Sequence, residues 1–208
     1  MLYASIAERR ADAAVHALGV TGAVLGCLAL AVFARGEPAV VVVTALYLTG
    51  LVATFACSAA FNLSQEGPRR ARLRRLDHAA IFLMIAGTYS PVAVLAIGGT
   101  GGAVLLALVW VGAMAGAAVK ILAFGRFVRW SVAAYLVLGW AGVAVFPELA
   151  RTMPWETLAL LAAGGFLYSL GVLAYRATWM RFHDAVWHAF VLAAAACHYA
   201  MVFRLVTA

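Results

Sequence analysis

Long uninterrupted apolar runs dominate this chain and are separated by short segments that contain charged residues, glycine or proline. The apolar positions do not alternate with polar ones, as in a half-buried strand, but continue for about 20 residues, the length that a helix needs to cross a bilayer. The pattern therefore predicts a single all-α membrane domain over residues 1–208, a bundle of seven transmembrane helices. The expected helices cover residues 12–33, 39–62, 75–96, 103–124, 129–146, 155–175 and 183–205.

The composition agrees with this pattern and excludes a water-soluble globular domain. Of the 208 residues, 66% are hydrophobic and 11% are charged, and the mean hydropathy is +1.00. A soluble chain with so few polar residues could not cover its surface with them. We expect the first apolar run to be a membrane span rather than a cleaved signal peptide, because it continues to Phe33 and is followed by further apolar runs.

The basic residues predict the orientation of the bundle, because lysine and arginine collect in the cytoplasmic loops of membrane proteins. With the N-terminus in the cytoplasm, twelve basic residues fall inside and three outside. We therefore expect a multi-pass protein of the cell membrane (the inner or plasma membrane), with its N-terminus cytoplasmic and its C-terminus outside. The inside set is Arg9, Arg10, Arg69, Arg70, Arg72, Arg74, Arg75, Lys120, Arg126, Arg129, Arg176 and Arg181, and the outside set is Arg35, Arg151 and Arg204.

The net charge of +7 does not indicate a nucleic-acid partner, since basic residues in a membrane protein usually set its topology. The loop after the second run, QEGPRRARLRRL at 65–76, predicts contact with membrane lipids, in particular with anionic headgroups of the inner leaflet. The sequence sets no oligomeric state. The arginines expected to contact the headgroups are Arg69, Arg70, Arg72, Arg74 and Arg75.

Ten polar side chains lie within or at the ends of the predicted spans, where ionisable groups are costly and mark candidate functional sites. The predicted topology brings most of them to the cytoplasmic ends of their helices. Residues four apart share a helix face, as Ser58 and Asn62 do. Asp184 and His188 share a face in the same way, and His198 continues it about 15 Å deeper. The ten are Asp12, His16, Ser58, Asn62, Asp77, His78, His183, Asp184, His188 and His198.

These residues also have ordinary structural explanations. Serine and asparagine in spans often only join helices by hydrogen bonds. His16 and His78 are equally consistent with wet imidazoles at the interface, and His198 with a polar contact between helices. We interpret His183 as interfacial, because it lies one position off the polar stripe of the last helix. Convergence of several such groups from distant parts of the chain favours a site.

Three segments resemble the hemolysin III family, which belongs to the wider PAQR group of adiponectin and progestin receptors. They are SAAFN at 58–62, RRLDHAAIFLMIAGTYSPV at 74–92 and FHDAVWHAFVLAAAACHYA at 182–200. The resemblance implies a seven-helix fold with the N-terminus inside. It also implies a zinc ion held by one histidine of helix 2 and two of helix 7, beside a helix 2 serine and a helix 3 aspartate. The activity it implies is ceramidase-like hydrolysis of lipid amides.

Part of the implied site is present in this chain. Ser58 and Asp77 match the family's serine and aspartate, and His188 and His198 match the later two positions of the helix 7 histidine pattern. On this resemblance we expect Ser58, Asp77 and His188 to be catalytic.

The implied histidine ligands are matched less well. Asn62 and Asp184 stand at two of the histidine positions, and His183 is displaced by one residue, which turns a side chain by about 100°. We expect a zinc site at Asn62, Asp184 and His188, weakened because the amide oxygen of asparagine is a poor donor to zinc. The alternative is a metal-free network in which Asp77 or Asp184 orients the His188 imidazole.

Three functions are consistent with these residues. The first is a metal-dependent hydrolase of lipid amides or esters, with its site at the cytoplasmic side of the membrane. The second is a receptor-like or lipid-sensing protein without catalysis. The third is ion or proton transport or pore formation. The fourth and fifth helices have almost no polar residues at their centres, which argues against this function.

Overall fold

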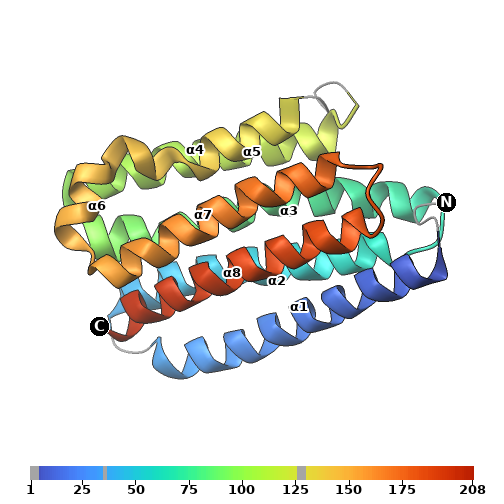
Figure 1. Ribbon diagram of the computed structural model, residues 1–208. Coiled ribbons are helices and arrows are strands. Elements are labelled where there is room, and N and C mark those ends of the chain that lie inside the picture. The colour runs from blue at the N-terminus through green and yellow to red at the C-terminus, as the bar shows by residue number, and fades with distance from the viewer. Residues whose placement is uncertain (1–4, 35–36, 126–129) are drawn as a thin grey trace.

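The computed structural model describes residues 5–34, 37–125 and 130–208, and throughout these ranges the regular structure is helical. Seven helical segments are long and apolar enough to cross a membrane, which confirms the predicted seven-helix bundle. Successive spans run in opposite directions and lie side by side (Figure 1). They are α1 (Ile6–Phe33), α2 (Pro38–Asn62), α3 (Pro68–Pro91) with the π-helix η1 (Val92–Ile97), α4 (Gly99–Leu122), α5 (Ser131–Gly139) with the 3-10 helix η3 (Ala141–Val145) and α6 (Phe146–Thr152), α7 (Trp155–Arg176) and α8 (His183–Thr207).

The start of α1 and the end of α8 lie at opposite ends of the bundle (Figure 1). We call the end at which α1 begins the N-terminal end. The arginines in the first turns of α3 lie at this end. The orientation in the membrane stays a prediction. Three basic residues that contribute to it, Arg35, Arg126 and Arg129, lie outside the described residues.

The first and third helices begin much earlier than the apolar pattern predicts, and the fourth begins at Gly99 instead of residue 103. The first begins at Ile6, because the side chain of Ser5 accepts a hydrogen bond from the backbone N–H of Glu8 and so caps the helix. The third begins at Pro68, with proline in its first turn, and so includes the arginine-rich segment. Charged turns can extend a spanning helix beyond the hydrocarbon, where an apolar run does not reveal them.

The third span changes its helical form directly after Pro91. Proline has no backbone N–H to donate to the preceding turn, and the chain continues as the π-helix η1 until Gly98, which has φ 66°. The irregularity therefore follows directly from a proline inside a membrane-spanning helix.

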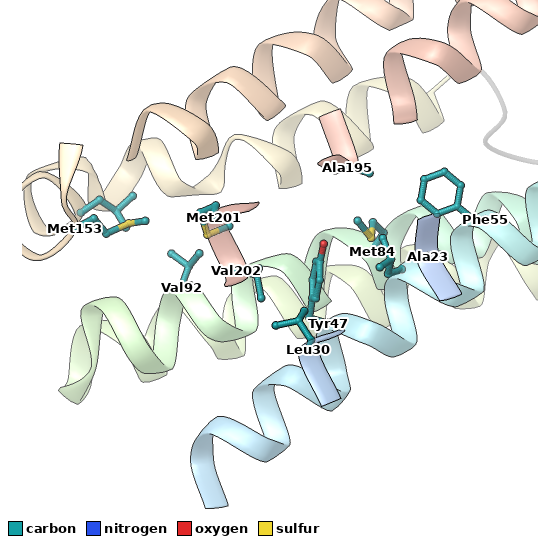
Figure 2. Close-up of a cluster of buried hydrophobic side chains, with 12 residues drawn as sticks. Ala23, Leu30, Tyr47, Phe55, Met84, Val92, Met153, Ala195, Met201 and Val202 are labelled. Carbon is teal, nitrogen blue, oxygen red and sulfur yellow. The ribbon is translucent and has the colours of Figure 1, made fainter. Parts of the chain in front are cut away.

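The centre of the bundle is closely packed between α2 and α3. A Cβ atom added to Gly50 would lie 2.7 Å from the carbonyl oxygen of Leu83, and one added to Gly87 would lie 2.9 Å from that of Leu46. The two glycines therefore allow the two backbones to approach each other directly. Tyr47 of α2 is completely buried beside this contact, in the core drawn in Figure 2.

The fifth span is the least embedded part of the bundle. It consists of α5, η3 and α6, and only Ser131, Gly142 and Leu149 of these three elements are buried. Tyr89 of α3 supports the break between α5 and η3, since its hydroxyl donates to the carbonyl oxygen of Gly139 at 2.7 Å and accepts from the N–H of Gly142 at 2.8 Å. The loose packing of this span leaves space between it and α3, α7 and α8.

Candidate functional site

Two cavities meet near the N-terminal end of the bundle. The larger one, of about 840 Å³, extends from Arg70 near the N-terminal end to Leu149 near the opposite end, and most of its wall is apolar. The smaller one, of about 50 Å³, lies among α1, α2, α3 and α8. Asp77 and His188 are the titratable residues that line both cavities, so their side chains lie where the two spaces meet.

Three titratable residues of α1 and α8 come together beside the smaller cavity. Within residues 5–34, 37–125 and 130–208, one group of three His, Cys, Asp or Glu ligand atoms comes within 4.8 Å of one another, at Asp12, His16 and His188. The Nδ1 of His188 donates to Oδ1 of Asp12 at 2.6 Å, and Nε2 of His16 lies 3.2 Å from the other carboxylate oxygen. We refer to these residues as the Asp12 trio.

The local helices explain how the trio forms. Asp12 and His16 are four residues apart on α1, so their side chains share one face of that helix. This face packs against α8, where the ring of His188 lies 4.4 Å from that of His16. The side chain of Asp12 is 0% exposed and that of His16 is 3% exposed. A carboxylate so deeply buried needs compensating partners, which the two imidazoles provide.

Ser58 and Asp77 complete the polar side of the small cavity. Together with His16 and His188 they line it, from α2 and α3 respectively. The carboxylate of Asp77 lies 3.4 Å from Nδ1 of His78, whose ring nitrogen donates to the carbonyl oxygen of Arg74. The predicted catalytic residues Ser58, Asp77 and His188 thus face one space, large enough for a water molecule.

The similarity of the chain to known proteins extends over nearly its whole length. The family described as Haemolysin-III related matches residues 6–199. The chain belongs to the Haemolysin-III related family. It is 32% identical over 194 residues to the Hemolysin-3 homolog of Bacillus subtilis (strain 168), which covers 92% of this chain and 91% of the relative. It is also 30% identical over 193 residues to Hemolysin-3 of Bacillus cereus, covering 92% and 88% of the two chains.

A more distant relative comes from animals. The chain is 28% identical over 167 residues to the human Monocyte to macrophage differentiation factor, with 76% of this chain and 68% of the relative covered. The resemblance inferred from the three sequence segments is therefore confirmed.

In this member of the Haemolysin-III related family, the three residues predicted to bind a metal share a cavity wall, but Asn62 and Asp184 contact other partners. Asn62, Asp184 and His188 all line the large cavity. The amide nitrogen of Asn62 donates to the backbone oxygen of Ser58 at 3.0 Å and to its hydroxyl at 3.3 Å. Asp184 lies beside His183, with 3.3 Å between the carboxylate and Nδ1.

The remaining histidines lie outside the Asp12 trio and have different contacts. They are His78, His183 and His198. His78 packs edge-on against Phe124. His198 is buried, and its Nε2 donates to the carbonyl oxygen of Leu161 at 3.1 Å, as expected for a polar contact between helices. The Nδ1 of His183 is buried without a hydrogen bond among the described residues. None of the three belongs to the Asp12 trio.

Asp12 is a polar residue in a span, but the site expected from the sequence does not include it. The available signal was its spacing of four residues from His16, which places a carboxylate and an imidazole on one helix face. The missing information was that α1 packs directly against α8. In this member of the family, the first helix therefore brings two titratable groups to His188.

The Asp12 trio has the donor set of a metal site. Two imidazoles and one carboxylate leave one position of a tetrahedral zinc open, as in catalytic zinc sites. The Nε2 of His16 is buried and makes no hydrogen bond among the described residues, although it lies close to Asp12. A buried nitrogen without a hydrogen-bond partner is unusual, and a bound cation would satisfy it. The residues that are present fit a divalent metal.

Proposed function

We propose that this protein is a membrane-embedded hydrolase of lipid amides or esters, and that Asp12, His16 and His188 hold the zinc ion it requires. The single observation that carries the proposal is the buried Asp12 trio, which borders a small cavity lined in part by polar side chains, next to a large and mostly apolar one. When bound, zinc supplies a Lewis acid that polarises a carbonyl group and makes a hydroxide nucleophile available near neutral pH.

Asp77 is the proposed general base. It lines both cavities, so it reaches water in the small one and substrate in the large one. Asp77 takes the proton of the water as the water oxygen bonds to the acyl carbon. It returns that proton to the leaving nitrogen or oxygen when the bond between this atom and the acyl carbon breaks. Ser58 donates a hydrogen bond to the oxygen that becomes negatively charged.

The large cavity supports a lipid as the substrate. A volume of about 840 Å³ falls in the range of pockets that enclose small molecules, and its wall is mostly apolar. An acyl chain in this cavity places its polar end beside Asp77 and His188, the titratable residues among those that line both cavities. The scissile bond would then lie where the two spaces meet.

Elemental analysis of the detergent-purified protein tests the metal site. We expect about one zinc per chain in the wild type and less than a tenth of that in His16→Ala and His188→Ala, because each removes one of three protein ligands. His78→Ala is the matched control, since His78 lies outside the trio, and should keep its zinc. Zinc in both trio variants at the wild-type level would contradict the site.

Turnover of lipid amides and esters, measured by release of a labelled fatty acid, tests the chemistry. We expect Asp77→Asn to keep its zinc but to lose activity by at least about 100-fold, the usual contribution of a general base. A protein that binds zinc yet turns over no amide or ester would contradict the hydrolase proposal. Thermal shifts with lipids but without turnover would favour the receptor-like alternative instead.

A further inference from the structure

The face of α3 that lines the large cavity carries two arginines above the proposed base. Arg70, Arg74 and Asp77 all line this cavity and are spaced by four and three residues, so they follow one side of the helix. At 1.5 Å per residue, Arg70 and Asp77 are about 10 Å apart along the helix axis. The cavity therefore has positive charge at its N-terminal end and an apolar wall beyond Asp77.

Arg70 is held with one edge of its guanidinium unpaired. The guanidinium carbon lies 4.7 Å from the centre of the Phe61 ring, a cation–π contact that fixes the plane of the group. Its Nε and Nη2 atoms are buried and have no hydrogen-bond partner among the described residues. Their N–H groups point the same way, and together they form the fork that binds a carboxylate or a phosphate with two parallel hydrogen bonds.

Arg74 adds a second charge one turn further along the same face. Its guanidinium lies 5.0 Å from the centre of the Phe124 ring, and the residue lines the cavity beside Arg70. Glu66 also lines this end of the cavity, so its charged lining residues there are two arginines and one glutamate. Arg69 and Arg72 lie on the same helix but do not line the cavity. Lining of the cavity thus distinguishes Arg70 and Arg74 from the other arginines of this segment.

We infer that the large cavity binds an anionic lipid, with the phosphate of its headgroup on the Arg70 fork and Arg74 and its acyl chain along the apolar wall. This inference rests on the proposed function and narrows its substrate class from lipids in general to those with a negative headgroup. The unpaired edge of Arg70 supplies the bidentate contact, and Arg74 supplies the second charge. The acyl bond then lies within reach of Asp77, further along the same helix face.

Binding to the purified full chain, measured by native mass spectrometry, tests the inference without any need for turnover or zinc. The probes are oleoyl lysophosphatidic acid, oleoyl lysophosphatidylcholine with the same chain but no net charge, and inorganic phosphate. We expect the wild type to bind the anionic lipid at least about tenfold more tightly than the zwitterionic one, the size expected for charge-assisted hydrogen bonds. Inorganic phosphate should not displace it, because the acyl chain contributes to binding.

Matched arginine variants separate the fork from charge in general. Arg70→Gln and Arg74→Gln should each reduce the preference for the anionic lipid severalfold, and together they should abolish it. Arg70→Lys should fall between, since lysine keeps the charge without the fork. Arg69→Gln and Arg72→Gln remove the same charge from the same segment and should keep the preference.

Three outcomes would overturn the inference. Equal affinity of the wild type for the two lysolipids would by itself contradict the inference, whatever the variants show. Equal losses in the Arg69 and Arg70 variants would show a nonspecific charge effect, and displacement by inorganic phosphate would show an anion site rather than a lipid site. Since His16→Ala removes the proposed zinc but not the arginines, it should keep the preference for the anionic lipid. Failure of the headgroup inference is therefore distinguishable from failure of the metal site.

Discussion

The carboxylate of Asp12 accepts a hydrogen bond of 2.6 Å from Nδ1 of His188, across 176 positions of sequence. This contact joins the first and the last spans at the N-terminal end of the bundle, next to the small cavity. It also fixes which nitrogen of His188 carries a proton when no metal is present, because a carboxylate can only accept. The site is therefore ordered by a contact that neither helix provides alone.

Asp12→Asn should destabilise the protein even when a chelator has removed every metal ion. The substitution replaces a buried, charge-assisted hydrogen bond by a neutral one, and we expect the free energy of unfolding to fall by about 1.5–3 kcal/mol. Reversible unfolding in mixed detergent micelles measures this change. Asp184→Asn is the control, since Asp184 is partly exposed and should change stability by about 1 kcal/mol or less. Equal effects of the two substitutions would argue against the role of Asp12.

Tyr89→Phe should weaken the junction between the third and fifth spans. The phenol hydroxyl bonds both Gly139 and Gly142, and its removal leaves two backbone groups without this partner. We expect a loss of about 1–3 kcal/mol in the free energy of unfolding. Tyr175→Phe removes the same hydroxyl from a side chain that is 42% exposed, and should be nearly neutral. Hydrogen exchange of the amides in α5 and η3 should speed up only in the Tyr89 variant.

Gly87→Ala should separate α2 from α3. The added methyl group would lie 2.9 Å from the carbonyl oxygen of Leu46 and 3.2 Å from Cα of Tyr47, both of which are backbone atoms that cannot turn away. We expect a loss of about 1–3 kcal/mol from overpacking, measured by thermal unfolding. Gly22→Ala is the control, because nothing lies within 4 Å of its new methyl group. That variant should gain about 0.5–1 kcal/mol, so a loss of equal size in both would contradict the close contact.

Cysteine labelling should reveal which end of the bundle faces the cytoplasm. In a background with Cys27, Cys57 and Cys197 replaced, Gln65→Cys places a thiol at the N-terminal end and Thr152→Cys places one at the opposite end. The basic residues predict that a membrane-impermeant maleimide applied to intact cells labels only Thr152→Cys. Permeabilised cells should show labelling at both. The reverse pattern in intact cells would mean that the orientation is inverted.

The seven spans were predictable because a bilayer imposes one requirement on every crossing helix, an apolar run of about 20 residues. The break in the fifth span was not, because it depends on a tertiary contact. The hydroxyl of Tyr89 bonds the backbone of Gly139 and Gly142 where the α-helix stops. The two glycines weaken a helix, but they do not identify the side chain that bonds them. A local pattern can show that a helix exists but not which distant side chain interrupts it.

The candidate site was predictable in its location but not in its membership. Ser58, Asp77 and His188 were expected together and do line one cavity. The expected site does not include Asp12, because the family resemblance implies ligands on the second and last helices. The hydrophobic periodicity of a helix also does not show which other helices pack against it. A buried carboxylate four residues from a histidine is nevertheless a sequence signal, since its cost in hydrocarbon requires a partner.

An odd number of crossings has a consequence for how this molecule can be duplicated. The first helix begins at one end of the bundle and the last helix finishes at the other. Two copies joined directly in tandem would therefore insert upside down relative to each other, with their polar ends on opposite sides of the membrane. A tandem protein with both polar ends on one side would need an additional crossing between the copies. The same constraint rules out joining the two ends of a single copy by a short linker.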